Sequence, residues 1–160
     1  MKVIGLVGGI ACGKSFIADA LERLGAGRFD GDRAGHQTLC EPQVKQAVQE
    51  LWGDEILDQK GEVIRRKLAE IVFAPAPNGP RELKRLEELV HPRIASALDL
   101  LLTELRTAGE CPAVVVDAAL LMEAGWDAQC DEVWFIDVPR ETRLRRAKTR
   151  GWTEEEFSAR

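Results

Sequence analysis

The fold is decided by the stretch Gly8-Gly9-Ile10-Ala11-Cys12-Gly13-Lys14-Ser15, which fits the pattern G-x4-G-K-S. An apolar run over residues 3–7 precedes it, as is typical of a strand buried on both faces of a parallel sheet. Apolar residues then recur at helical spacing over residues 16–24, and Gly25 ends that helix. The pattern therefore stands between a strand and a helix, which is the context in which it is specific.

The residue types of this stretch suit the binding of a phosphate chain. Glycines allow the backbone to turn with its amides pointing inward, and the following helix adds partial positive charge at its N-terminus. Lys14 supplies a point charge for the β- and γ-phosphates of a nucleotide, and the Ser15 hydroxyl suits Mg²⁺. A glycine-rich turn without a ligand is the alternative, but such a turn does not require the pair Lys14-Ser15. We therefore interpret the stretch as a nucleotide-binding P-loop.

Length and composition indicate one globular domain. The 160 residues, 45% apolar and 31% charged, suffice for a core of its own. A net charge of −5 gives no general attraction for nucleic acid or anionic lipid, and we expect neither as a partner. No apolar stretch in the sequence is long enough to cross a membrane. The four cysteines lack CxxC spacing and indicate free thiols, so we expect a cytoplasmic protein.

Three further segments read as strands: a weak one at Arg28-Phe29, and stronger ones over residues 113–116 and 132–138. Strands that alternate with helices predict an α/β fold with a parallel sheet covered on both faces. The last strand would lie at an edge of this sheet with apolar residues on both sides. Because a bare apolar edge is an aggregation liability, we expect a further C-terminal piece that covers it.

The region between the second and third strands reads as helical. Amphipathic helices are predicted over residues 43–52 and 65–73, and a cluster of proline and glycine over residues 75–80 separates them from a longer helix. That helix is predicted from about Glu82 to Arg106, and Pro92 could break it.

Carboxylates follow two of the predicted strands. Asp117 ends the strand over residues 113–116, where it could hold Mg²⁺ in a P-loop fold or cap the next helix. Asp30 and Asp32 follow the strand at residues 28–29. Since strand carboxyl ends share one edge with the P-loop, either carboxylate could accept a proton from a hydroxyl placed in line with the γ-phosphate. A turn is the alternative, because Asp-Gly favours turns.

A basic helix is predicted over residues 141–150. Arg143, Arg146 and Arg150 would share one face of it, where they could close over a triphosphate or simply form a solvated basic face. Arg65 and His91 say little alone, since a histidine before a proline is usually a capping or packing residue.

Several segments together resemble the dephospho-CoA kinase family. In the family's order they are residues 5–15, Asp30-Gly31-Asp32, residues 61–68 with Arg65, Phe73, Leu89-Val90-His91-Pro92, Leu120-Leu121-Met122-Glu123, and Asp137-Val138-Pro139 with Arg146 and Arg150. They cover essentially the whole chain. Singly only the P-loop is specific, and together they are a strong signal.

The resemblance implies a P-loop kinase that uses ATP and Mg²⁺ to phosphorylate the ribose 3′-hydroxyl of dephospho-CoA, working as a monomer or small homo-oligomer. It implies catalytic roles for Asp32 as base, Lys14 and Arg146. Nucleotide contacts are implied for Gly8, Gly9, Ile10, Ala11, Cys12, Gly13, Lys14, Ser15, Phe16, Arg146 and Arg150. Contacts to dephospho-CoA are implied for Asp32, Arg65, His91, Leu120 and Glu123. Ser15 and Asp117 remain the expected magnesium residues.

The resemblance also divides the chain. It implies a core of about residues 1–32 and 111–139, a helical substrate-binding subdomain of about 33–110, and the start of a lid at 140–160. Phe16, Gly31 and Val7 replace residues common in the family, namely threonine, alanine and threonine, without removing a charge or a ligand. Family members usually continue past the position of Arg160, so we expect that a last strand and helix are missing and that the lid is partial.

Three other functions compete with this interpretation. A nucleotide-hydrolysing switch such as a GTPase would require an Asn-Lys-x-Asp motif after a strand, and the sequence has none. A nucleoside monophosphate kinase shares the P-loop and an arginine lid, but its acceptor is a phosphate and needs no aspartate base. A nucleotide-binding module with little or no turnover is the third possibility.

Overall fold

Four parallel strands form the sheet that the sequence predicts. They are β1 (Lys2–Val7), β2 (Gly27–Asp30), β3 (Ala113–Asp117) and β4 (Glu132–Phe135), in the order β2-β3-β1-β4. The sequence predicts that the last strand reaches Val138, but β4 ends at Phe135. The next residue, Ile136, still donates its amide hydrogen bond to the Val7 carbonyl at the end of β1. Because the strands are parallel, the carboxyl ends of β1, β2 and β3 lie at the same edge of the sheet. The P-loop follows β1 at this edge, and the predicted aspartates lie at or just after the ends of β2 and β3.

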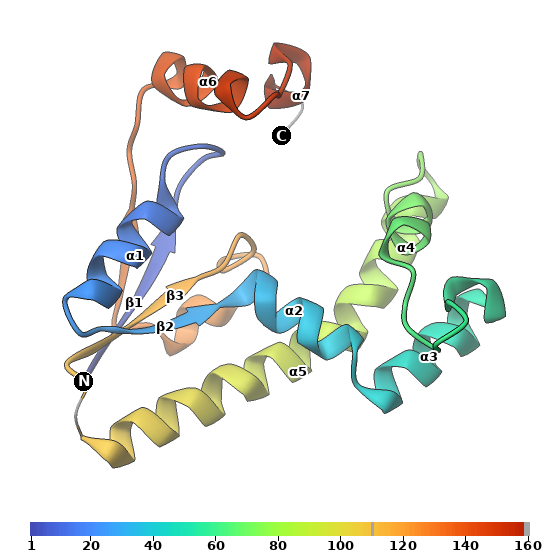
Figure 1. Ribbon diagram of the computed structural model, residues 1–160, viewed down its shortest axis with the longest axis horizontal. Helices are drawn as coiled ribbons and strands as arrows, with labels where there is room; N and C mark the ends of the chain where they lie inside the picture. The colour runs from blue at the N-terminus through green and yellow to red at the C-terminus, as the bar shows by residue number, and fades with distance from the viewer. Residues whose placement is uncertain (110, 159–160) are drawn as a thin grey trace. The chain divides into compact units, whose positions relative to one another are not determined.

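The structure describes residues 1–109 and 111–158 of this computed structural model. The chain forms two units (Figure 1): one contains residues 1–31 and the chain from Leu101 onward, and the other is Asp32–Leu100. The first unit carries the sheet and the second is helical. The helical unit thus begins one residue before the expected boundary and ends ten residues before it, inside a long helix.

Helices cover both faces of the sheet in the first unit. On one face, Ala18 of α1 (Lys14–Arg23) packs with Ile4, Leu6 and Val115. On the other face the glycines of the strands make room for close neighbours. A Cβ on Gly27 would lie 2.8 Å from Leu105 of α5 (Asn78–Ala108). The predicted three-layer α/β architecture is therefore confirmed.

The edge strand β4 is exposed, as the sequence predicts. Val133, Trp134 and Phe135 are all exposed in the structure, and Trp134 donates a hydrogen bond of 3.0 Å to Glu132 on the same strand. β4 pairs with β1 on one side only. This strand is the least covered part of the sheet.

The helical unit has a core of its own. Its helices are α2 (Gly31–Leu39), α3 (Pro42–Trp52), α4 (Arg65–Val72) and the first part of α5, with the short helix η1 (Asp54–Ile56). Val44, Val48, Ile56, Leu68 and Val72 are buried together, and Leu83, Leu86 and Leu89 of α5 pack against them. The amphipathic patterns of α3 and α4 were correctly located to within a residue.

The long helix α5 differs from its prediction at two prolines. It begins at Asn78, four residues earlier than expected, so that Pro80 lies in its first turn, where a missing amide costs no helical hydrogen bond. Pro92 lies inside the helix without ending it. Near Pro92, the Arg93 guanidinium donates to the Leu89 carbonyl and the Ser96 hydroxyl donates to the Pro92 carbonyl.

The remaining helices belong to the first unit. After β3 the chain passes through η2 (Trp126–Gln129) to β4, and beyond β4 it forms α6 (Arg140–Thr149) and the short α7 (Glu154–Ser158). α6 is the predicted basic helix, shifted by one residue. Within the described residues, no helix has the length and apolarity needed to cross a membrane.

Candidate active site

The P-loop joins β1 to α1 in the predicted arrangement. The Cys12 amide donates to the Gly9 carbonyl at 3.1 Å, and the Ile17 amide to the Gly13 carbonyl at 3.1 Å. Ala11 has a positive φ of 59° and Gly13 one of 106°. Left-handed residues within such a loop turn successive amides toward one side, which creates the concave backbone surface that binds anions.

Lys14 lies at the first position of α1 and turns back over the loop. Its Nζ donates to the Gly8 carbonyl at 3.1 Å, which holds the ammonium group against the loop. The first turn, residues 14–17, contains no acidic residue, so the positive end of the helix dipole is not offset there. Ser15 and Phe16, in the same turn, are exposed. The loop, the lysine and the helix end together suit a phosphate chain.

Asp117, at the end of β3, has a partner that the sequence did not predict. Its Oδ2 accepts a hydrogen bond of 2.8 Å from Nη2 of Arg28 on β2. Arg28 also donates to Asp19 of α1 at 2.5 Å, and Glu22 lies 3.9 Å away. Burial lowers the pKa of Arg28, but hydrogen bonds with Asp117 and Asp19 outweigh this effect, so the pKa lies above its ordinary value. One guanidinium thus links the sheet to α1.

The Arg28–Asp117 pair is nearly buried, since the side chains are 18% and 11% exposed. Replacing Arg28 with Met leaves the Asp117 carboxylate in that place without its cation. We expect a loss of about 3 kcal/mol in the free energy of unfolding, which urea denaturation measures. Met at Arg66, an exposed residue paired with Glu70, is the matched control and should change stability by about 0.5 kcal/mol or less.

A second substitution separates the charge from the packing. In Arg28→Met combined with Asp117→Asn, the uncompensated carboxylate is gone, and part of the lost stability should return. A stable Arg28→Met variant would contradict the assignment of this ion pair as a stabilising link.

Asp30 and Asp117 end adjacent strands and are paired in register. Because residues in register on neighbouring strands face the same side of a sheet, these two carboxylates and Arg28, two residues before Asp30, lie on the face that α1 covers. Asp32 follows Gly31 and lies exposed in the first turn of α2, where the helix N-terminus favours a carboxylate. The two residues of the Asp-Gly-Asp stretch thus belong to different elements.

Gly31 has a structural reason to lack a side chain. A Cβ at this position would lie 2.6 Å from the Ala118 Cβ, closer than van der Waals contact allows. Gly31 stands where the family that the sequence resembles commonly has alanine. The space that an alanine methyl group would need at this position is occupied by Ala118, which is buried just after β3.

The arginines of α6 contact the P-loop. Nη1 of Arg146 donates to the Cys12 carbonyl at 2.8 Å and to the Ala11 carbonyl at 3.3 Å. Nε of Arg143 donates to the Val138 carbonyl at 3.0 Å. Arg150 is exposed at the C-terminal end of α6. The structure therefore brings Arg146 to the P-loop and leaves Arg150 at the end of the helix.

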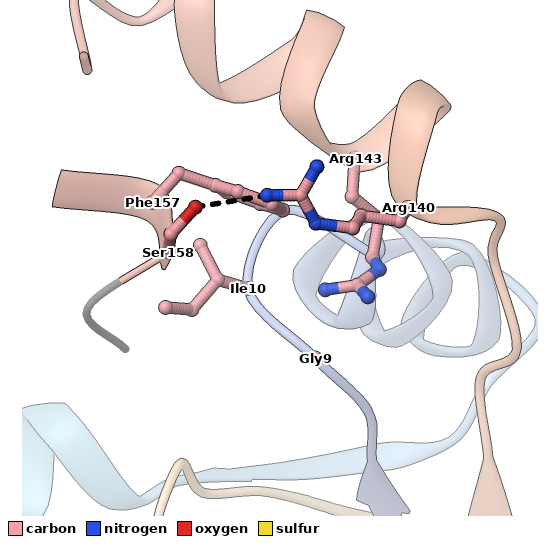
Figure 2. Close-up of a pocket in the computed structure, with 6 residues that line it drawn as sticks. All are labelled: Gly9, Ile10, Arg140, Arg143, Phe157 and Ser158. Carbon is pink, nitrogen blue, oxygen red and sulfur yellow. Dashed lines mark hydrogen bonds between the residues drawn. The ribbon is translucent and has the colours of Figure 1, made fainter. Parts of the chain in front are cut away.

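A cavity of about 340 Å³ lies where α6 and α7 meet the P-loop (Figure 2). It is lined by Gly9, Ile10, Arg140, Arg143, Phe157 and Ser158. Three of these lining residues were not predicted from the sequence: Arg140, Phe157 and Ser158. Arg140 precedes Arg143 by three residues, as Arg143 precedes Arg146, so the helical spacing could have found it. Phe157 and Ser158 lie in a charged tail that gave no signal.

The residues expected to bind dephospho-CoA lie in both units. Arg65 is the first residue of α4, and His91 lies within α5, both in the helical unit. Leu120 and Glu123 are exposed in the segment that follows β3, whereas their neighbour Leu121 is buried beneath Gly5. Their roles stay predictions.

The parallel sheet, the P-loop after β1 and the arginine-bearing helix over that loop define the class of P-loop phosphotransferases. Comparison with known proteins gives the family. The chain belongs to the dephospho-CoA kinase family, whose model matches residues 2–160.

Two relatives illustrate the similarity. The dephospho-CoA kinase of Dehalococcoides mccartyi is 35% identical over 161 residues, which is 100% of this chain and 79% of that protein. The dephospho-CoA kinase of Geobacter sulfurreducens is 40% identical over 151 residues, covering 94% of this chain and 74% of that protein.

Solved structures agree on the fold. The crystal structure of TT1252 from Thermus thermophilus is similar to 99% of this chain and 78% of that one, with a TM-score of 0.82 and 32% identity. The dephospho-CoA kinase from Campylobacter jejuni gives a TM-score of 0.65 at 22% identity, over 99% of this chain and 77% of that one. These structures confirm the fold, and the family model and the relatives above confirm the family predicted from the sequence segments.

Proposed function

We propose that this protein transfers the γ-phosphoryl group of ATP to the ribose 3′-hydroxyl of dephospho-CoA, giving coenzyme A and ADP. The observation that carries the proposal is the family match over residues 2–160 of a chain whose P-loop geometry is intact. ATP use follows from the same family and loop. The acceptor hydroxyl, the metal and the residue roles below are part of the proposal.

The P-loop would hold the phosphate chain of ATP. Backbone amides of the loop and the N-terminus of α1 would surround the β- and γ-phosphates, and the Lys14 ammonium would add its charge there. These groups stabilise charge that builds up on the bridging oxygen as the bond to the γ-phosphorus breaks. Arg146, bonded to two carbonyls of the loop, would add a second cation beside it.

Asp32 would accept the proton of the acceptor. In the transfer, the ribose 3′-oxygen forms a bond to the γ-phosphorus, the bond from that phosphorus to the β–γ bridging oxygen breaks, and ADP leaves. The hydroxyl proton passes to the Asp32 carboxylate and then to solvent, so that the aspartate is regenerated. An exposed carboxylate at the start of α2 can exchange that proton freely.

The two residues proposed to bind Mg²⁺, Ser15 and Asp117, differ in how freely their oxygens could reach the ion. The Ser15 hydroxyl is exposed in the first turn of α1, beside Lys14, and suits a magnesium ion held by phosphate oxygens. Asp117 has one carboxylate oxygen engaged by Arg28, so it would act through its other oxygen or through water. When bound, Mg²⁺ would neutralise phosphate charge.

The remaining contacts are proposed from the family resemblance. The proposed contacts to dephospho-CoA are Arg65, His91, Leu120 and Glu123. The proposed further contacts to ATP are Phe16 and Arg150.

The product of the reaction tests the proposal directly. The protein is incubated with ATP, Mg²⁺ and dephospho-CoA, and mass spectrometry together with phosphorus NMR identifies the product and the position of its new phosphate. We expect a 3′-phosphorylated product and one ADP for each. AMP and adenosine are the control acceptors and should give little product. Phosphorylation of AMP in preference to dephospho-CoA would instead indicate a nucleoside monophosphate kinase.

A further inference from the structure

Phe157 is the one buried side chain of α7 among its described residues. It is 6% exposed, whereas Glu154, Glu155, Glu156 and Ser158 are exposed. A helix of five residues with three consecutive glutamates has little tendency to pack on its own. The burial of Phe157 therefore fixes this short helix to the rest of the first unit.

The neighbours of the Phe157 ring are cationic. The Arg140 guanidinium lies 5.4 Å from the ring centroid and that of Arg143 lies 5.5 Å from it. Figure 2 shows the Arg140 side chain reaching from α6 toward Phe157 and Ser158. Guanidinium groups at this distance from an aromatic face are attracted by its quadrupole. One ring thus holds two cations that would otherwise repel each other.

Both guanidinium groups are also held by hydrogen bonds. Nη2 of Arg140 donates to the Ser158 hydroxyl at 2.8 Å, the bond drawn in Figure 2, and Nη1 lies 3.8 Å from Glu154. Nε of Arg143 donates to the Val138 carbonyl. The same guanidinium lies against the P-loop, because a Cβ on Gly9 would be only 2.5 Å from its Nη1.

We propose that Phe157 is a positioning residue, which holds the guanidinium groups of Arg140 and Arg143 beside Gly9 and Ile10 so that their cavity receives a phosphate group of the nucleotide. The cavity joins two cationic side chains to the start of a phosphate-binding loop. Arginine forks match phosphate oxygens in geometry as well as charge. This inference rests on the proposed function, since it assumes that the P-loop binds ATP.

The ring, rather than apolar bulk at this position, is the essential feature. Leu in place of Phe157 would keep an apolar side chain in contact with α6 but would lose both cation–π contacts, whereas Trp would keep a ring face for the guanidinium groups. The two substitutions therefore separate the positioning of the arginines from simple packing of α7.

The test measures the Kd for ADP and for a non-hydrolysable ATP analogue by calorimetry, on the full chain. Phe157→Leu should raise both Kd values about tenfold, whereas Phe157→Trp should leave both Kd values close to those of the unchanged protein. Phe135→Leu, the same change at an exposed residue of β4, is the matched control and should bind as the unchanged protein does. Thermal unfolding of each variant checks that the protein remains folded.

A second pair of variants does not depend on the folding of α7. Arg143→Gln should weaken binding about tenfold, and Arg145→Gln, an exposed neighbour on the same helix, should not. If Phe157→Leu is folded and binds normally, if Leu and Trp weaken binding equally, or if Arg143→Gln binds normally, the proposal is overturned.

These outcomes are independent of those for the proposed function. Failure of the unchanged protein to phosphorylate dephospho-CoA would remove the acceptor assignment while leaving the nucleotide-binding comparison intact. Normal turnover by the unchanged protein together with normal binding by Phe157→Leu would remove the positioning role alone.

Discussion

Asn in place of Asp32 should lower kcat for the phosphorylation of dephospho-CoA about a thousandfold, while the Kd for ATP stays within about twofold of its value. The amide has nearly the shape of the carboxylate but cannot accept the hydroxyl proton. Because Asp32 is exposed in the first turn of α2 and is not part of the P-loop, its loss should leave the phosphate-binding groups in place. Steady-state kinetics and calorimetry together measure the two quantities.

Asp30→Asn is the matched control for this prediction. Asp30 ends β2 on the face that α1 covers, two residues before Asp32, and carries the same chemical group. We expect a smaller loss of kcat in this variant. A larger loss for Asp30→Asn than for Asp32→Asn would transfer the base role to Asp30, and a loss of ATP affinity with normal turnover in Asp32→Asn would contradict the base role altogether.

Met in place of Lys14 should lower kcat/KM for ATP by about 10²–10³-fold and also weaken ADP binding. Met keeps the aliphatic stem but removes the ammonium group that lies over the loop at the Gly8 carbonyl. The charge is needed both for the bound phosphates and for the transition state, so both quantities should fall. Enzyme kinetics and calorimetry with ADP measure them separately.

The control for Lys14→Met is the same change at Lys60, an exposed residue of a turn in the helical unit. It removes one positive charge from the protein without touching the P-loop, and we expect near-normal activity. If Lys14→Met were as active as Lys60→Met, the P-loop would have no part in the reaction.

Much of the fold followed from local sequence patterns. The buried strand before Gly8, the helix after Ser15 and the strand ending at Asp117 were all located within a residue or two. The start of α5 was misplaced because proline and glycine in residues 75–80 signal a break, yet proline is tolerated in the first turn of a helix. Local patterns could not decide between these outcomes because the packing of α5 against the helical core decides them.

The site was predicted less completely than the fold. The P-loop was evident from spacing, and Arg146 does reach it. The ion pair between Arg28 and Asp117 joins residues 89 positions apart, and no local pattern encodes such a contact. The role proposed for Phe157 could not be predicted for a similar reason, because a single aromatic residue in a charged tail has no periodicity. That role depends on the two guanidinium groups that the fold places beside the ring.

The hydrogen-bond partners of the arginines on α6 have a practical consequence for experiments. Arg143 and Arg146 donate hydrogen bonds to carbonyls of Val138, Ala11 and Cys12, and Arg143 also faces an aromatic ring. None of these described partners bears a full negative charge. A protein with an overall charge of −5 thus keeps a small region of uncompensated positive charge. Sulfate, inorganic phosphate or pyrophosphate in a buffer would compete for that region, so assays and crystallisation trials should begin in chloride or acetate salts.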